Sequence, residues 1–203
     1  MDDPQRYDYL FFPVGLNLRG RRCVVIGDDR EAVEKEEALR EAGAEVVRLR
    51  DPSQVGENDL AGAFFVISTP QDAELSARMR AYAERHRFLL CCIDQPVYGF
   101  VAMQAVAKSG PVRVAISTGG VSPAVGSTMR RALSAALDER FARFMACLQA
   151  IRRRVRGESQ AEERKQRMRD AAAGFTVEVA VTYPAWFTGA EASQGPNTLP
   201  PSR

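Results

Sequence analysis

The sequence has little of what membrane insertion, secretion or metal binding requires. None of the apolar runs in its 203 residues approaches the ~20 residues that a helix needs to span a bilayer. Its first residues, MDDPQRYDYLFF, are acidic and lack the basic segment and apolar stretch of a secretion signal. We therefore expect a cytoplasmic protein with no membrane partner.

Cysteine is also scarce. The four cysteines show no Cys-x-x-Cys or Cys/His ligand spacing, which argues against a metal site. Cys23, Cys91 and Cys92 lie inside apolar runs. We therefore predict buried thiols that stay reduced.

Charge is abundant but unevenly distributed. Residues 130–169 contain twelve Lys and Arg and five Asp and Glu, a net charge of +7, which leaves −5 for the rest of a chain whose total is +2. Such an asymmetry predicts an anionic partner, although a solvated face of helices would explain it equally well. Aromatic residues are not interleaved with the basic stretch, so we expect no nucleic acid partner.

Five short apolar runs predict strands of a buried sheet. They are residues 23–26, 46–49, 64–67, 88–93 and 112–116. Helical patterns lie between them: one ends at Gly43, and another follows Thr69-Pro70, which we interpret as its cap and first residue. Alternating strands and helices predict an α/β fold with a Rossmann-like parallel sheet.

The pattern changes after Gly120. From Pro123 to about Ala173 only helical periodicity remains, with an apolar stripe that is either a helical core or a dimer face: Leu133, Leu137, Phe141, Phe144 and Leu148. We predict a Rossmann-like dinucleotide-binding domain over 1–120 and a helical dimerisation and substrate region over 121–173. The tail, 174–203, has one β-like run, FTVEVAV, and is predicted to be largely disordered.

The turn after the first strand departs from the dinucleotide-binding pattern Gly-x-Gly-x-x-Gly. It reads Gly27-Asp28-Asp29-Arg30-Glu31-Ala32. The second glycine of the pattern allows the backbone to approach a pyrophosphate, and Asp29 places a side chain and a negative charge there. Like charges a few Å apart repel by roughly 1 kcal/mol in water. An Asp at a helix start also binds the N–H groups that a phosphate would use. The loop is therefore predicted to carry its own anion and to bind NAD weakly.

Three segments carry a resemblance to a known family. They are FPVGLNLRG (12–20), DLAGAFFVIS (59–68) and VRVAISTGGVSP (112–123), the last with Asp94 upstream in CCIDQP. Over roughly residues 10–170 the chain resembles the precorrin-2 dehydrogenase family, the N-terminal part of siroheme synthases, some members of which also insert iron.

The resemblance implies an enzyme of siroheme and haem biosynthesis. Such an enzyme is a homodimer that oxidises precorrin-2, a tetrapyrrole with eight carboxylates, to sirohydrochlorin with NAD. By this resemblance Asp94 is the catalytic base, and Thr118, Gly119, Gly120 and Ser122 bind the substrate. The implied cofactor residues are Gly27, Asp28, Asp29, Arg30, Glu31, Asp51, Pro52, Ser68 and Thr69.

Several residues keep other interpretations open. Asp94 could simply open a turn before Pro96, and the Gly119-Gly120 pair with Ser122 could be a tight turn and a helix cap. Cys91 stands where relatives have Asn, and the connection from Asp51 to the next strand is short. An NAD-free tetrapyrrole-binding or regulatory protein and a ferrochelatase-like enzyme are the alternatives.

Overall fold

The computed structural model describes residues 11–157 and 160–184. The chain forms two compact units that divide between Arg143 and Phe144. The domain boundaries at 120 and 173 stay predictions, and most of the tail predicted to be disordered, residues 185–203, lies outside the described residues.

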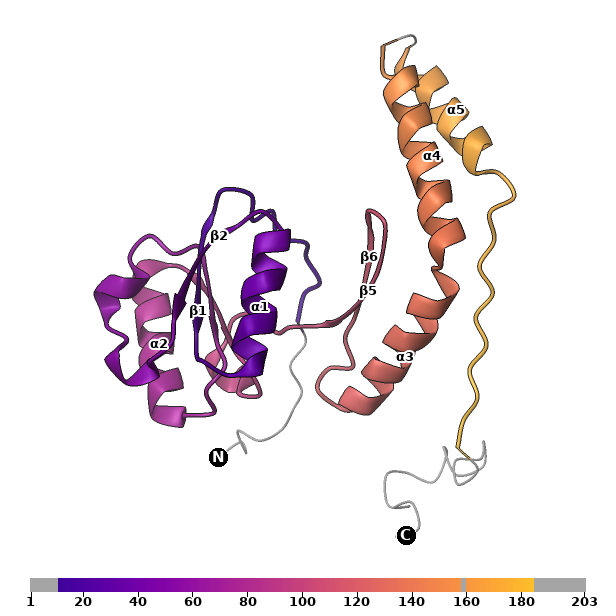
Figure 1. The fold of residues 1–203 in the computed structure, drawn as a ribbon. Coiled ribbons are helices and arrows are strands. Elements are labelled where there is room, and N and C mark those ends of the chain that lie inside the picture. The colour runs from indigo at the N-terminus through magenta and orange to yellow at the C-terminus, as the bar shows by residue number, and fades with distance from the viewer. Residues whose placement is uncertain (1–10, 158–159, 185–203) are drawn as a thin grey trace. The chain divides into compact units, whose positions relative to one another are not determined.

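The first unit contains a four-stranded parallel sheet in the order β2-β1-β3-β4. The strands are β1 (Arg22–Ile26), β2 (Glu45–Leu49), β3 (Phe65–Ser68) and β4 (Leu89–Cys92). Helix α1 (Arg30–Glu41) connects β1 to β2, and α2 (Ala73–His86) connects β3 to β4. The two helices cover opposite faces of the sheet (Figure 1). This arrangement confirms the first four predicted strands and the Rossmann-like fold.

Alternate residues of the strands supply two buried clusters, one on each face. On the α2 face Val24 and Val66 pack with Met79 and other residues of that helix. On the α1 face Val25 and Ile67 pack with Leu39. Complete burial of a side chain of this size is worth about 1.5–3 kcal/mol, so the sheet rests on apolar contacts from both sides.

The predicted thiols are confirmed as buried and unpaired. Cys23, Cys91 and Cys92 are buried, and all four cysteines, including the exposed Cys147, are free. Burial raises the pKa of Cys91 to about 12, and the neighbouring Cys92 adds to that shift. These thiols therefore fill the core and are not nucleophiles.

The start of α2 differs from the prediction. Asp72, not Thr69, is the N-cap, and its Oδ1 accepts hydrogen bonds from the N–H groups of Glu74 at 2.9 Å and Leu75 at 3.0 Å. Thr69 instead follows β3 directly, three residues before the cap, and its backbone N–H donates to Ile26 O of β1 at 3.0 Å. The predicted end of α1 is confirmed, since Gly43 directly follows the cap residue Ala42.

The fifth predicted strand lies in a different sheet. Strand β6 (Val112–Ile116) pairs antiparallel with β5 (Ala105–Ser109), which the sequence did not reveal, and the two form a separate sheet. Gly110 (φ 51°) and Pro111 make the two-residue turn between them. So short a turn can join only antiparallel strands, because a parallel pair requires a long crossover.

Helices dominate the rest of the described chain. They are α3 (Pro123–Ala136), α4 (Glu139–Val155), which crosses the boundary between the units, and α5 (Ala161–Ala172). Three short 3₁₀ helices complete the elements: η1 (Pro52–Gln54), η2 (Glu57–Leu60) and η3 (Pro96–Tyr98). None of the helices within the described residues is long and apolar enough to cross a membrane.

The β-like run 175–181 forms no strand, so that interpretation was wrong. Alternating Val177, Val179 and Val181 are 64, 78 and 67% exposed, and no described residue of the chain pairs with them. A strand needs a neighbour for its backbone groups, whatever its side-chain pattern. Phe175 at its start is anchored within the second unit by stacking on Phe144, with ring centroids 5.4 Å apart.

Candidate functional site

A pocket of about 430 Å³ lies in the first unit at the carboxyl end of β4. Its walls come from the strand end with Asp94, the segment 101–105, the end of β6 through residues 117–120, and the first turns of α3. Crevices at the carboxyl ends of parallel strands are where ligands bind in open α/β sheets. The pocket brings together Asp94, Thr118, Gly119 and Gly120.

Asp94 has an unusual backbone. It is one of two non-glycine residues with positive φ (57°) among the described residues, in the left-handed region. An ordinary L-residue is less stable there by roughly 1–2 kcal/mol, although Asp and Asn tolerate it. The side chain is exposed, and the Gln71 Nε2 donates a hydrogen bond to its Oδ2 at 3.0 Å. The turn before Pro96 therefore exists, and it presents a carboxylate at the pocket.

Opposite Asp94 stands the loop that leads into α3. Ser122 does not line the pocket: it caps α3, with its Oγ accepting a hydrogen bond from the Val125 N–H at 3.3 Å, and its own N–H donates to Thr118 Oγ1 at 3.4 Å. The cap and the Pro123 start of α3 are thus confirmed. Ser122 positions Thr118 without itself facing the pocket.

Two cations in the pocket were missed from the sequence. Lys35 and Arg130 line it together with the acidic Glu31 and Asp94. Lys35 Nζ lies 3.1 Å from Glu31 Oε1, an i,i+4 pair on α1. The signal for Lys35 was its spacing from Glu31, a predicted cofactor residue. Arg130 begins the basic stretch 130–169, but nothing in the sequence singled it out as a residue of this pocket.

The turn after β1 depends on a glycine at position 27. Gly27 is buried with φ 132°, and a Cβ added there would lie 2.2 Å from Thr69 Oγ1. Only glycine allows the loop to approach β3 so closely. The turn therefore keeps the first glycine of the dinucleotide pattern for a physical reason that the structure displays.

Asp29 occupies the start of α1. Its Oδ1 accepts a hydrogen bond from the Ala32 N–H at 2.7 Å, and its Oδ2 accepts one from the Thr69 hydroxyl at 2.7 Å. These bonds, that of Ala32 first, lower the pKa of Asp29, so the carboxylate stays ionised. The predicted anion is present in the loop, and it takes an N–H group that a phosphate would use.

Asp28 is neutralised by two arginines from β2 and its end. The Arg48 guanidinium makes a very short contact with Asp28 Oδ1, and Arg50 Nη1 donates to the same oxygen at 3.0 Å. Arg48 also donates to Gly27 O at 3.2 Å, which ties β2 to the turn. Its side chain is 9% exposed, against 69% for Arg50.

The other predicted cofactor residues have local partners or are buried. The oxygens of Asp51 accept bonds from Ser53 and Gln54 at 2.6–3.0 Å, and the Ser53 hydroxyl is the first cause of a lowered Asp51 pKa. Pro52 begins η1 directly after this cap. Ser68 is fully buried at the end of β3, and its Oγ has no hydrogen-bond partner in the described chain. The structure thus joins Gly27, Asp28, Asp29 and Thr69 around one turn, next to exposed Arg30, and leaves Asp51 and Pro52 engaged elsewhere.

The turn fits a dinucleotide in its backbone and in its balance of charge. Gly27 keeps the close approach to β3, and Arg48 and Arg50 offset Asp28. Asp29 is the obstacle, because its charge has a hydroxyl and an N–H as partners rather than a cation. Among the described residues there is also no group of three or more His, Cys, Asp or Glu that could hold a metal ion.

Comparisons with known proteins agree with this architecture. Residues 14–105 match a family described as NAD(P)-binding. The siroheme synthase of Nitrosococcus oceani is 26% identical over 72% of this chain and 35% of its own length. The siroheme synthase of Methylococcus capsulatus is 30% identical over 73% of this chain and 35% of its own length. The chain thus spans about a third of the length of the curated relatives it matches.

A solved structure shows the same fold. The structure of SirC, a precorrin-2 dehydrogenase, superposes with a TM-score of 0.64 at 21% identity, over 81% of this chain and 90% of SirC. The match extends well beyond the sheet, since the four strands end at Cys92. The chain therefore shares the fold of SirC, and it is similar in sequence to about a third of the length of the siroheme synthases.

Proposed function

We propose that this chain is an NAD-dependent oxidoreductase that converts precorrin-2 to sirohydrochlorin in siroheme and haem biosynthesis. One observation carries the proposal: Asp94, held in a left-handed backbone at the carboxyl end of β4, shares a pocket with Thr118, Gly119 and Gly120. These are the residues that the family resemblance assigns to the base and to the substrate loop. The Rossmann-like sheet supports the cofactor assignment.

The reaction removes a hydride and a proton from the macrocycle. The Gly27 turn would hold NAD⁺, and the bound cofactor would supply the acceptor for the hydride. The Asp94 carboxylate accepts the proton as the ring becomes conjugated, and it returns that proton to water afterwards. Gln71 is a positioning residue, because its amide holds one oxygen of Asp94 and leaves the other for the substrate.

The pocket offers partners for only part of a polycarboxylate. Lys35 and Arg130 can pair with carboxylates, and Arg130 can do so with two parallel hydrogen bonds. Val101, Met103 and Ile116 provide apolar surface for the ring. With Glu31 and Asp94 also present, the charges of the described lining residues balance, so most substrate carboxylates need cations beyond these.

We further propose a cytoplasmic homodimer. Val125 and Met129 lie one turn apart at the start of α3 and are 52 and 46% exposed, and Val121, just before the helix, is 83% exposed. An exposed apolar row at this spacing is suited to a helix of a second copy. Val125→Glu should yield a monomer in sedimentation at micromolar concentration, and a wild-type monomer would contradict the proposal.

A specific observation favours one alternative, an NAD-free protein that binds tetrapyrroles. Asp29 already holds the N–H of Ala32 at the start of α1. Calorimetric titration with NAD⁺ separates the two functions. Heat of binding would support the dehydrogenase function, and the absence of heat at millimolar NAD⁺ would rule that function out.

The variant Asp94→Asn tests the catalytic assignment. Asn tolerates the left-handed backbone and keeps the size of the side chain, so the fold should survive. Turnover of precorrin-2, followed by NADH absorbance without oxygen, should fall roughly 10²- to 10⁴-fold with NAD⁺ affinity unchanged.

Asp72→Asn is the matched control. Asp72 caps α2 near the same sheet edge but does not line the pocket, and Asn is an equally good cap. It should keep full turnover. Full turnover of Asp94→Asn would end the assignment of this residue as the base.

A further inference from the structure

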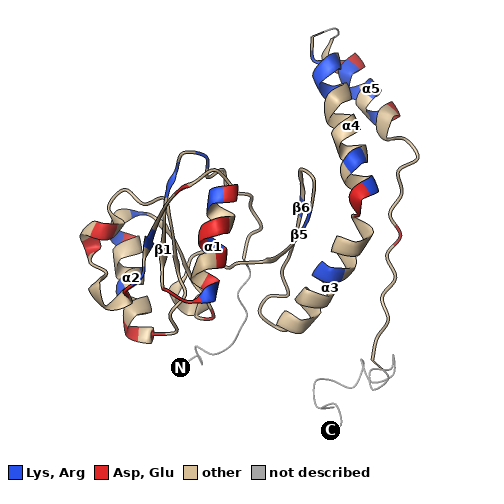
Figure 2. Cartoon of the chain, in the orientation of Figure 1, with Lys and Arg blue, Asp and Glu red and all other residues tan. Residues whose placement is uncertain are grey.

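A groove of about 710 Å³ lies between α4 and α5 within the second unit. Five of its lining residues are cations: Arg152, Arg156, Arg164, Lys165 and Arg169. Figure 2 shows the concentration of Lys and Arg at the end of α4 and on α5. The volume is in the range of small-molecule sites, about 300–1,000 Å³.

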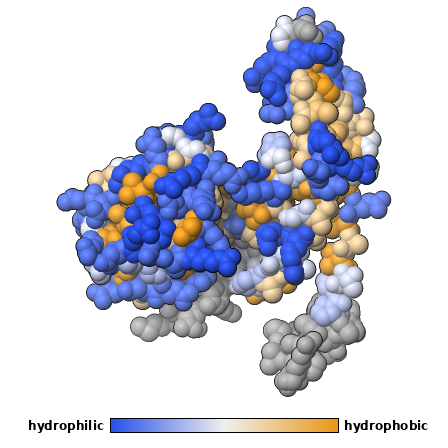
Figure 3. Space-filling view, viewed as in Figure 1, coloured by the Kyte–Doolittle hydropathy of each residue, from blue (hydrophilic) through white to orange (hydrophobic). Residues whose placement is uncertain are grey.

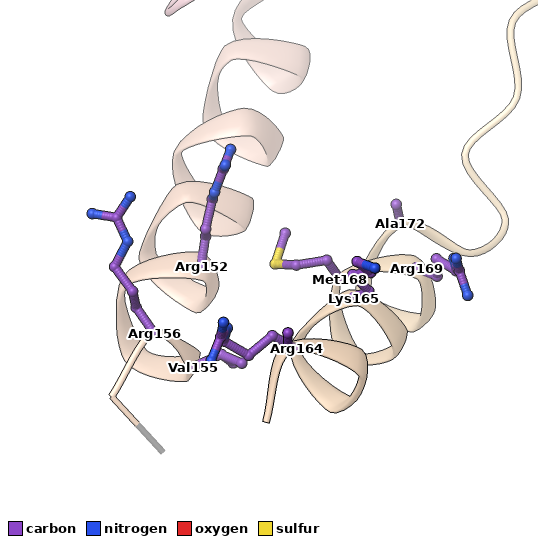
Figure 4. Close-up of a pocket in the computed structure, with 9 residues that line it drawn as sticks. Arg152, Val155, Arg156, Arg164, Lys165, Met168, Arg169 and Ala172 are labelled. Carbon is purple, nitrogen blue, oxygen red and sulfur yellow. The ribbon is translucent and has the colours of Figure 1, made fainter. Parts of the chain in front are cut away.

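The floor of the groove is apolar. Val155 is 4% exposed, and Met168 and Ala172 are half-buried. Met168 extends from α5 toward α4, next to Arg152 (Figure 4). Apolar and hydrophilic surface thus adjoin along the two helices (Figure 3). This combination suits a ligand with an apolar body and a charged rim.

Four cations of the groove, Arg152, Arg156, Lys165 and Arg169, have few anionic partners among the described residues. Lys165 Nζ lies 3.0 Å from Glu162, but both side chains are more than 60% exposed, and such pairs contribute about 0–1 kcal/mol. Arg169 donates to the amide of Gln166 at 3.4 Å. Arg152 and Arg156 make no hydrogen bond or ion pair with any described residue, and none of the described lining residues is acidic. An anionic ligand would relieve the repulsion among them.

We propose that this groove is a second binding site for an organic polycarboxylate with an apolar ring. Arginine pairs with carboxylates through two parallel hydrogen bonds, and Val155 and Met168 would contact the ring. No aromatic side chain is among the described lining residues, so the groove lacks the stacking surface that single-stranded nucleic acids use.

The identity of the ligand rests on the proposed function. The substrate and product of that reaction are eight-carboxylate macrocycles, and Lys35 and Arg130 are the two cations among the described residues that line the pocket beside Asp94. The groove takes a macrocycle of this class separately from Asp94, as a holding site for substrate or product.

Equilibrium titration of the full-length protein with uroporphyrin, a stable octacarboxylate, tests the proposal. Wild type should bind two molecules per chain, one in each site. Arg152→Glu/Arg169→Glu should lose one of them, with at least a 10-fold weaker affinity at the groove. The control Arg153→Glu/Arg167→Glu changes the charge of the same helices equally, at exposed residues outside the groove, and should keep both sites.

Three results would overturn the groove site. The first is an equal loss of porphyrin affinity in both double variants. The second is that Arg152→Glu/Arg169→Glu still binds two porphyrins with unchanged affinity. The third is that a short oligothymidylate displaces the groove-bound porphyrin at a lower concentration than free uroporphyrin does. Circular dichroism checks that both variants keep their helices. Failure of the proposed function is a separate result. If the protein neither binds NAD⁺ nor turns over precorrin-2, the loss of one bound porphyrin in Arg152→Glu/Arg169→Glu still supports the groove as a binding site.

Discussion

Replacing Asp29 by glycine should strengthen the binding of NAD⁺. The substitution restores a Gly-x-Gly turn at residues 27–29, removes a negative charge from the start of α1, and releases the Ala32 N–H that Asp29 now holds at 2.7 Å. A phosphate could then accept a hydrogen bond from that N–H group, as in other dinucleotide-binding turns.

The magnitude follows from these contacts. A like charge a few Å from a phosphate is unfavourable by about 1 kcal/mol in water and more in a cleft. The released N–H adds roughly 1–2 kcal/mol as a hydrogen bond to a charged group. These terms sum to about 2–3 kcal/mol, so at 1.4 kcal/mol per factor of ten the dissociation constant of NAD⁺ should fall roughly 30- to 140-fold.

The same substitution should destabilise the fold modestly. Glycine is an N-cap only a few tenths of a kcal/mol worse than Asp. The Thr69 hydroxyl loses its bond to Asp29 and donates its one hydrogen to Ile26 O, 3.3 Å away, instead, so the total loss is about 1 kcal/mol. Urea unfolding measures this loss, and calorimetry measures the affinity for NAD⁺.

Two further variants separate charge from capping. Asp72→Gly removes the equivalent cap of α2 and should lower stability similarly while NAD⁺ affinity stays unchanged. Asp29→Asn keeps the cap and removes only the charge, so it should give part of the gain in affinity. If Asp29→Gly binds NAD⁺ no better than wild type, then Asp29 is not the obstacle and the charge argument fails.

Other outcomes follow from the same contacts. Gly27→Ala should lower the free energy of unfolding in urea by about 2–4 kcal/mol, because its Cβ would fall 2.2 Å from Thr69 Oγ1 and its φ is unfavourable for alanine. Gly20→Ala, at a positive φ but with open space around it, should lower it by only about 1–2 kcal/mol. Equal losses in the two variants would refute the clash at Gly27. Ellman's reagent should modify Cys147 rapidly in the native protein and the three buried thiols only after denaturation, and rapid labelling of Cys91 would contradict the burial that raises its pKa to about 12. The pKa of Asp29 is lowered in the folded state, so its stabilisation is present above its unfolded pKa of about 4 and disappears as pH falls through the folded value. Urea midpoints of Asp29→Asn should therefore fall less steeply below about pH 4 than those of wild type, and parallel curves would show that Asp29 does not contribute.

The sheet was predictable because its signal is local and redundant. Four apolar runs, three of them largely buried and the β2 run half-buried at the edge of the sheet, were separated by helical patterns, and that alternation leaves few topologies. The hairpin was missed because Ala105–Ser109 (AVAKS) is barely apolar and because Val112–Ile116 looks like a fifth buried strand until its partner is known. The strand predicted over 175–181 was wrong for the opposite reason: its residues have a strand-like pattern, but no described segment pairs with them.

The site was only partly predictable. Asp94 and the Thr118–Gly120 loop were placed by family resemblance, and the structure sets them around one pocket. The anion at Asp29 was expected from capping chemistry. The neutralisation of Asp28 was not, because Arg48 and Arg50 are twenty or more residues away and reach the turn only through the register that pairs Arg48 with Val25.

Helix α1 connects the turn to the pocket. Asp29 caps its start, Glu31 lies in its first turn, and the Lys35 that pairs with Glu31 stands one turn further along. Glu31 and Lys35 both line the pocket beside Asp94. A change at Asp29 that lets the first turn of α1 fray would therefore move two charged groups of the pocket as well as the cofactor loop. The capping carboxylate thus weakens the cofactor site by its charge while it holds the pocket's cation in place by its hydrogen bonds. Asparagine at position 29 is the substitution that removes the first effect and keeps the second.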